Sequence, residues 1–202
     1  MRCICLFSIM LLGAAAADAA DYAGLHDRLL DFYSFQRAGT NGYNPHNPFY
    51  TRTPYPHAGD SHGSNALDGG WYDAGDFVKF GLNLGFSAYC LLKGYDVFPG
   101  AYDDRDSWSR SGTPDGIPDV LGQVKVATDY LLKAVIDENT VVRDVGEGNS
   151  DHQVWASGYD HHQSRQVFLA EGADIPGMYA ASLALMSMLY ASYDAAYASS
   201  CL

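Results

Sequence analysis

Two aspartates three residues apart are the strongest candidates for chemistry in this sequence. Asp73 and Asp76 close the segment Asp68-Gly-Gly-Trp-Tyr-Asp-Ala-Gly-Asp76, hereafter the aspartate loop. Its glycines permit tight backbone turns, and the spacing predicts both carboxylates on one side of a turn at a helix start. Such a pair can hold one water molecule, with one oxygen taking its proton while another orients it. Helix capping is the simpler interpretation, but the flanking Gly-Gly-Trp-Tyr favours a functional pair.

Four helices must position this loop. Apolar side chains at helical spacing predict helices at roughly 21–38, 77–95, 118–135 and 174–190. Long polar connections rich in Gly, Trp, Tyr, His and Asp separate them, at 39–76, 99–117 and 139–173. Loops of this length in a compact domain usually carry function. No strand alternation stands out, so we expect an all-α fold with its site on the loop side.

The composition narrows the classes of function. The 202 residues contain 24 acidic and 12 basic side chains, giving a net charge of −12. Nucleic acids and anionic membrane surfaces are therefore poor partners, because both require a basic patch. Hydrophobic residues make up 48% of the chain and aromatic residues 13%, which allows one packed core and is compatible with a surface on which sugars stack.

The N-terminus resembles a secretory signal. Apolar residues follow Arg2, and Ala17-Asp18-Ala19 fits a small-x-small cleavage site. A membrane anchor needs about 20 apolar residues, and Asp18 and Asp21 end the run too early. We therefore expect a cleaved signal at residues 1–19, a secreted mature chain from residue 20 to 202, and no stable membrane insertion.

Two cysteines remain after that cleavage. Cys90 and Cys201 either pair or stay as thiols, since no CxxC or zinc-type spacing occurs. Cys90 lies in the apolar stretch Phe86–Leu92 and is expected to pack in the core.

The aspartate loop resembles the N-terminal signature of glycoside hydrolase family 9, a family of inverting cellulases and related β-1,4-glucanases. The residues that carry the resemblance are Gly69–Asp76 and the following Val78-Lys79-Phe80. The similarity continues over most of the mature chain, at Tyr22–Arg37, Gly59–Ser61, Val120–Lys133, Val145–Gly148, Asp151–Trp155 and Ala180–Met188. The family implies an (α/α)6 barrel. This chain would be a truncated N-terminal portion of that catalytic domain: a partial barrel whose long loops form a substrate cleft at one end.

The resemblance also implies roles for single residues. Asp76 resembles the general base that deprotonates the attacking water, and Asp73 resembles its helper on the same water. His152 and Trp155 resemble substrate contacts. Trp71 and Tyr72 place two further rings beside the aspartates, and we expect them to bind substrate as well.

The implied reaction is hydrolysis of β-1,4-glucosidic bonds in cellulose or related β-glucans by single displacement. Inversion requires an acid and a base about 6.5–9.5 Å apart on opposite faces of the sugar. Asp73 and Asp76 are too close in sequence to straddle a sugar and belong on the water side. The family's acid is a later Glu, and none of Glu138, Glu147 and Glu171 lies in its motif, so the chain alone is expected to be inactive.

The sequence differs from the family pattern at positions that concern substrate binding rather than the water-activating pair. Gln153-Val154-Trp155 stands where the family often has Lys-Trp-Trp, and Met178 where it often has Glu.

No cofactor is predicted; calcium is possible by resemblance for a longer protein, without a ligand set in these residues. Arg165 resembles a family arginine and is expected to pair with a carboxylate near the site. Endo or processive action, the preferred β-glucan and the oligomeric state are not defined by the sequence.

Two other functions compete with hydrolysis of a glucan. One is a non-catalytic carbohydrate-binding or inert fragment, which the missing acid favours. The other is a metal-dependent hydrolase that uses His152, His161 or His162. Adjacent histidines cannot easily face one ion, however, and no third ligand has a suitable spacing.

Overall fold

The computed structural model describes residues 22–42, 55–105 and 113–202. The predicted signal at 1–19 lies outside the described residues. None of the helices in those three ranges combines the length and apolar character that a bilayer-spanning segment requires.

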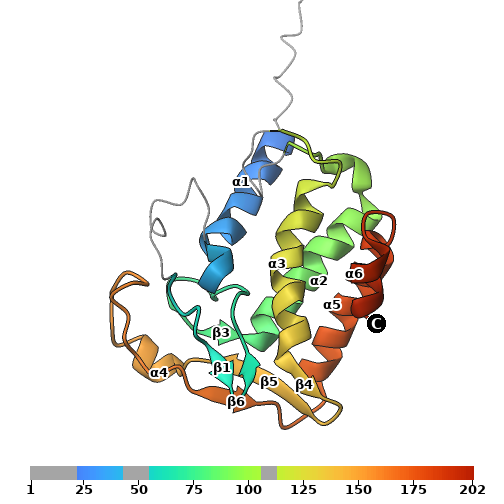
Figure 1. Cartoon of the computed structure of the whole chain (residues 1–202). Coiled ribbons are helices and arrows are strands. Elements are labelled where there is room, and N and C mark those ends of the chain that lie inside the picture. Colours follow the sequence, from blue (N-terminus) through green and yellow to red (C-terminus); the bar gives the residue numbers. More distant parts are fainter. Residues whose placement is uncertain (1–21, 43–54, 106–112) are drawn as a thin grey trace, which may run out of the picture.

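Helices dominate the described chain, and all but the short α4 lie side by side (Figure 1). They are α1 (Tyr22–Phe35), α2 (Gly81–Val97), α3 (Asp119–Ala134), the short α4 (Gly148–Asp151), α5 (Asp174–Tyr190) and α6 (Ala195–Ser200), with 3₁₀ turns at Gly39–Gly42 and Pro99–Ala101. The four long helices confirm the four expected from apolar spacing.

Helix α3 is the centre of the core. Pro118 precedes it, Asp119 lies in its first turn and Lys133 in its last, an order of charge that suits the helix dipole. Its apolar side chains are buried on almost every side, because α1, α2 and α5 all pack against it. The helix therefore fixes the relative positions of the elements around the aspartate loop.

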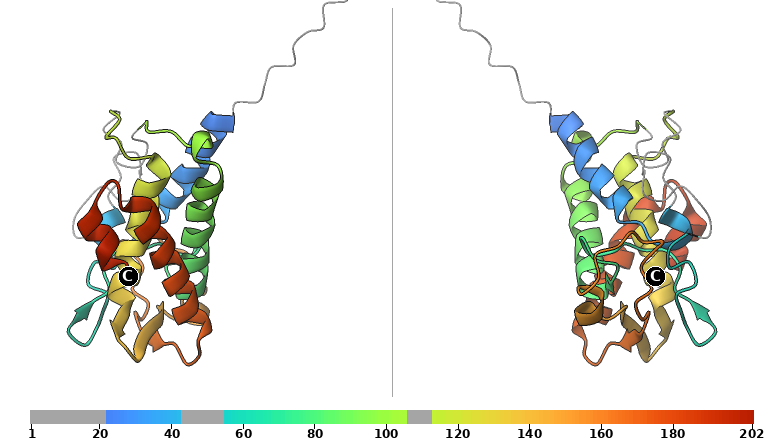
Figure 2. Two further views of the ribbon diagram at one scale, coloured as in Figure 1. Left: turned by 90° about the vertical axis from the view of Figure 1, so that its right-hand side faces the viewer. Right: turned by 90° about the vertical axis from the view of Figure 1, so that its left-hand side faces the viewer.

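The expectation of an all-α fold is wrong in one respect, since two small antiparallel sheets accompany the helices. One pairs β1 (Ser61–His62) with β2 (Asn65–Ala66). In the other, β5 (Thr140–Val145) pairs with β3 (Lys79–Phe80), β4 (Val135–Asp137) and β6 (Val167–Leu169). Figure 2 shows these strands gathered at one end of the helices.

A tight turn explains the missed hairpin. The apolar periodicity of α3 runs on into Val135, but the chain reverses after Asp137, whose carboxylate accepts the Asn139 N–H at 2.8 Å. The β-branched residues of β5 then pair back on β4.

Helix α2 begins at Gly81 rather than near residue 77. Lys79 and Phe80 are held in extended form, because they pair with Val145 and Asp144 of β5. A Cβ atom on Gly81 would collide with the Tyr179 hydroxyl and with a β5 carbonyl, so glycine permits the close approach at this junction. The aspartate loop therefore leads into a strand, and the aspartates are four or more residues away from the helix start.

Large apolar side chains on the outer faces of two helices are exposed to solvent. They are Leu25, Leu29, Phe32 and Phe35 on α1, and Leu82 and Phe86 on α2. Cys90 lies on α2 and is exposed, which corrects its expected place in the core, whereas Cys201 is buried. Both cysteines are free thiols.

Candidate functional site

The first half of the aspartate loop is anchored in the core. Gly69 and Gly70 adopt positive φ angles of 92° and 79°, which glycine tolerates. The backbone then pairs with the end of α1, since the Tyr72 N–H donates to the Gln36 carbonyl at 2.8 Å. The rings of Trp71 and Tyr72 are only 2% and 4% exposed. The structure thus gives both rings a packing role, and substrate contact by them stays a prediction.

Asp73 lies where the loop turns back. Its N–H donates to the Val78 carbonyl at 3.1 Å and closes the loop. Its carboxylate accepts the Asn83 side-chain amide at 2.6 Å. Asp73 borders a hollow of about 390 Å³ together with Leu82 and Phe86, so it faces the outer side of α2.

Asp76 has a different environment. One carboxylate oxygen accepts the Val78 N–H at 3.0 Å, and the other lies 2.9 Å from His152 Nε2. The Asp76 side chain is 10% exposed and that of His152 58%. The hydrogen bond to Asp76 raises the pKa of His152 above its ordinary value.

An open groove begins at Asp76. It has a volume of about 350 Å³ and is lined by Gly75, Asp76, Asp151, His152, Gln153, Val154 and Trp155; we call it the Trp155 groove. Trp155 is 96% exposed, so its ring offers a free face. The structure thus brings Asp76, His152 and Trp155 together, whereas Asp73 borders a separate hollow.

A buried ionic cluster beside the loop holds it in place. Asp60 accepts two hydrogen bonds from Arg165, both at 2.9 Å, and lies 2.9 Å from Lys79 Nζ. Arg165 also donates to the Phe77 carbonyl at 2.6 Å. This confirms the expected pairing of Arg165 with a carboxylate near the site. One carboxylate therefore links the loop before the aspartates, β3 and the segment that follows the Trp155 groove.

The opposite charges in this cluster offset the unfavourable effect of burying each charged group. Burial alone would raise the pKa of Asp60, but the bonds from Arg165 and the charge of Lys79 outweigh it and lower that pKa. Burial lowers the pKa of Lys79 to about 8, against the opposing effect of Asp60. Sequence reasoning missed Lys79 as a partner. The only signal for it was a cation between two apolar residues, Val78 and Phe80.

The three histidines suggested for a metal site do not converge. His152 contacts Asp76, whereas the buried His161 lies 3.0 Å from Asp151 and 3.2 Å from His57. The neighbouring His162 is exposed. Among the described residues, no three His, Cys, Asp or Glu side chains are arranged as metal ligands would be. His57 was not foreseen, because its partner lies 104 positions away in sequence.

Comparison with known proteins gives one consistent result. The family model described as "Glycosyl hydrolase family 9" matches residues 22–202. Endoglucanase 13 of Arabidopsis thaliana is 32% identical over 96% of this chain and 38% of its own length. The endoglucanase of the termite Nasutitermes takasagoensis is 31% identical with a TM-score of 0.75, over 91% of this chain and 41% of that chain.

A further solved structure contains a sugar. The cellulase Cel9M of C. cellulolyticium, in complex with cellobiose, is 30% identical with a TM-score of 0.78, over 92% of this chain and 42% of that chain. The present chain thus spans about two fifths of the length of these relatives.

Proposed function

The chain belongs to glycosyl hydrolase family 9, and from this premise we propose that it supplies the water-activating side of an enzyme that hydrolyses β-1,4-glucosidic bonds in cellulose or related β-glucans. The observation that carries the proposal is the Trp155 groove, in which a carboxylate, a histidine and an exposed indole meet. An exposed indole is suited to stacking on the apolar face of a sugar.

In this proposal Asp76 is the general base. Each of its oxygens accepts one hydrogen bond from the protein, and an ionised carboxylate has further lone pairs for a water molecule. Asp73 is the proposed helper residue on the same water. Its carboxylate borders the neighbouring hollow, but its charge adds to the larger effect of Asp76 in raising the pKa of His152, which supports a position close to the pair. His152 and Trp155 bind the sugar, with single displacement and inversion as the outcome. Carboxylates and water suffice for the proposed step.

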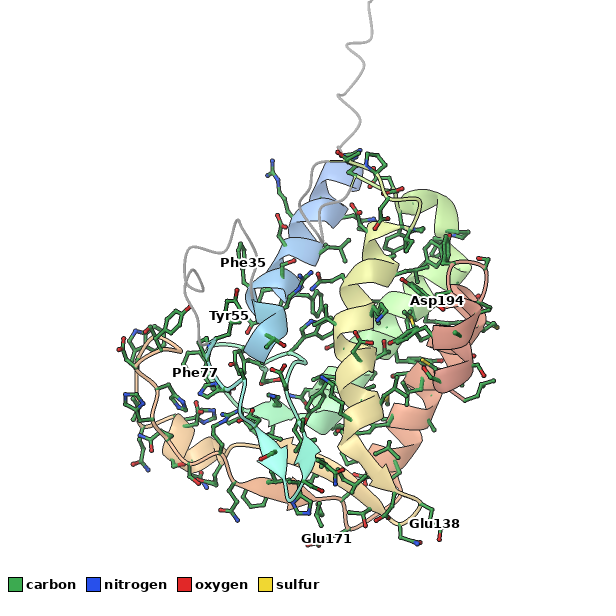
Figure 3. All side chains as sticks on the ribbon, viewed as in Figure 1. Phe35, Tyr55, Phe77, Glu138, Glu171 and Asp194 are labelled. Atoms are coloured by element: carbon green, nitrogen blue, oxygen red, sulfur yellow. The ribbon has the colours of Figure 1, made fainter. Side chains whose placement is uncertain are left out.

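The general acid has no counterpart among the glutamates. Glu138 and Glu171 lie at the sheet end of the molecule, well away from Phe77, which directly follows Asp76 in the sequence (Figure 3). Glu147 caps α4, where hydrogen bonds from the Ser150 and Asn149 N–H groups lower its pKa. A general acid requires the opposite shift. We therefore propose that the acid comes from a portion of the catalytic domain outside these 202 residues.

The helices are, on this proposal, part of an (α/α)6 barrel with the substrate cleft at its loop end. The exposed apolar faces of α1 and α2 support it, because patches of this kind mark surfaces that other elements cover. A cleaved signal at residues 1–19 and secretion belong to the same proposal, since the substrate is an extracellular polymer.

Binding of cellotetraose to the purified chain, measured by calorimetry and by tryptophan fluorescence, tests the proposal. We expect saturable binding that changes the emission of Trp155. Trp155→Ala should abolish that change. Phe98→Ala, which removes an exposed ring that does not line the groove, should keep it. An unchanged titration in Trp155→Ala would contradict the groove assignment.

A second function is favoured by the missing acid, namely carbohydrate binding without catalysis. Release of reducing ends from soluble cello-oligosaccharides separates the two. The chain alone should bind without release. A chain joined to the C-terminal portion of a family 9 cellulase should release them, and a binding module would not.

A further inference from the structure

Four side chains from distant segments form a largely buried polar network, hereafter the histidine network. The Tyr72 hydroxyl lies 2.6 Å from His57 Nδ1, and His57 Nε2 lies 3.2 Å from His161 Nδ1. His161 Nε2 then lies 3.0 Å from one oxygen of Asp151. That carboxylate oxygen and His161 Nε2 are both buried, and neither has a hydrogen-bond partner of regular geometry among the described residues, so the 3.0 Å contact between them is the polar contact available to each.

The contact with Asp151 indicates which nitrogen of each ring carries the proton. The Asp151 carboxylate only accepts, so His161 donates from Nε2 and its neutral ring accepts at Nδ1. His57 therefore donates from Nε2, and its Nδ1 accepts from the Tyr72 hydroxyl, for which the Pro56 carbonyl at 3.4 Å is a second acceptor. Both histidines are neutral in this arrangement. Burial, reinforced by the nearby Arg165 charge, lowers the pKa of His57 to about 3, although Asp60 opposes the shift.

The backbone of His57 has a strained conformation that its surroundings must maintain. His57 has a φ of 59° and is the only non-glycine residue with a positive φ in the described ranges. Such a conformation is unfavourable for a residue with a side chain and persists only where surrounding contacts determine it. The rings of Tyr72, Phe77 and His161 surround His57 at centroid distances of 5.2 to 5.6 Å.

Asp151 connects this network to the site. Its second oxygen accepts the Phe77 N–H at 3.1 Å. Phe77 follows Asp76 directly, and His152 follows Asp151 directly. The Asp151 carboxylate therefore joins the backbones that carry the two partners of the Asp76–His152 pair.

We propose that His57 and His161 are positioning residues, which hold Asp151 in place and thereby keep His152 in contact with Asp76. The geometry alone carries this inference. It depends on the proposed function only for what Asp76 does once it is positioned.

Two substitutions of His161 separate the halves of the network. In His161→Gln the amide nitrogen can occupy the place of Nε2 and donate to Asp151. In His161→Asn the shorter amide reaches only the place of Nδ1, so the bond to Asp151 is lost. Ser157→Ala is the control, because it removes an exposed hydrogen bond to Asp160 in the same loop.

Nuclear magnetic resonance of the imidazole nitrogens gives a readout that packing alone would not change. In the unsubstituted chain we expect neutral Nε2–H tautomers at His57 and His161 near pH 7. The pKa of His152 should fall towards its ordinary 6.5 in His161→Asn, yet stay raised in His161→Gln and in Ser157→Ala.

Nδ1–H tautomers, or the same His152 pKa in all three variants, would overturn the proposal. Thermal unfolding of each variant identifies one that fails to fold, and the tautomers of the unsubstituted chain then decide the matter. Absent cellotetraose binding together with the expected tautomers and pKa values would refute the proposed function and leave the positioning role intact.

Discussion

The two halves of the aspartate loop are contiguous in sequence but have opposite environments. Residues 69–72 are buried, and their rings pack into the core. Residues 73–76 are partly or fully exposed, and Asp76 opens onto a groove. The difference shows that one short motif performs two tasks, since the buried half fixes the position of the half that carries the carboxylates.

The largest expected effect is on turnover, from a change in the exposed half. Asp76→Asn should lower turnover about 10²- to 10⁴-fold, the usual contribution of a general base, with little change in stability. The rate is measured in this chain joined to the C-terminal portion of a family 9 cellulase. Asp96→Asn, at an exposed ion pair with Lys93, is the matched control. Near-normal turnover in Asp76→Asn would remove Asp76 from the chemistry.

The next largest effect is on folding, from the buried half. Trp71→Ala should lower the free energy of unfolding by about 3–5 kcal/mol, because it empties a large core volume. Denaturant titration measures the change. Trp155→Ala should leave stability nearly unchanged, since its ring is exposed. Equal losses of unfolding free energy in the two variants would contradict the difference between Trp71 in the buried half of the loop and the exposed Trp155.

A glycine pair tests the same contrast at smaller scale. In Gly70→Ala the new Cβ would lie 2.7 Å from the Tyr130 ring, at a φ of 79°, and strain of this kind costs about 1–3 kcal/mol. Gly75 has nothing within 4 Å of the corresponding position, so Gly75→Ala should change stability by less than about 0.5 kcal/mol. Chemical denaturation of both variants gives the comparison, and a reversed order would contradict it.

The smallest effect is a pH dependence from His152. Its folded pKa is raised by the bond to Asp76, so its contribution to stability is present below the ordinary value of 6.5 and is lost as pH rises through the folded pKa. The effect is small because His152 is exposed. Melting temperatures between pH 5 and 9 should show this loss in the unsubstituted chain and not in Asp76→Asn. The same slope in both would show that the contact does not stabilise the fold.

The helical frame could be predicted because helical periodicity is a local signal. Helices α3 and α5 begin within a residue of the positions that Pro118 and Asp174 indicated. The strands were missed because β1 to β4 and β6 have at most three residues each, too few for an alternating pattern. Only Thr140–Val145, with its β-branched residues, offered a usable signal for strand β5.

The site was partly predictable for the same reason. Asp76 was found from a short motif, His152 and Trp155 followed from the family resemblance, and the structure brings all three to one groove. The Asp60 cluster and the histidine network depend on pairs about a hundred positions apart. Local spacing contains no information on such contacts. The burial of Trp71 likewise follows from tertiary packing, which a motif cannot reveal.

The ion pair between Arg165 and Asp60 has a consequence for how the groove can vary. It fixes one end of the segment 152–164, and the bond from Phe77 to Asp151 fixes the other. Residues 153–157, which lie between these fixed ends and leave His152 and His161 in place, can be exchanged without changing either anchor. The wall of the groove is therefore a natural place to graft segments from relatives, so that preference for one glucan over another could be redesigned independently of stability.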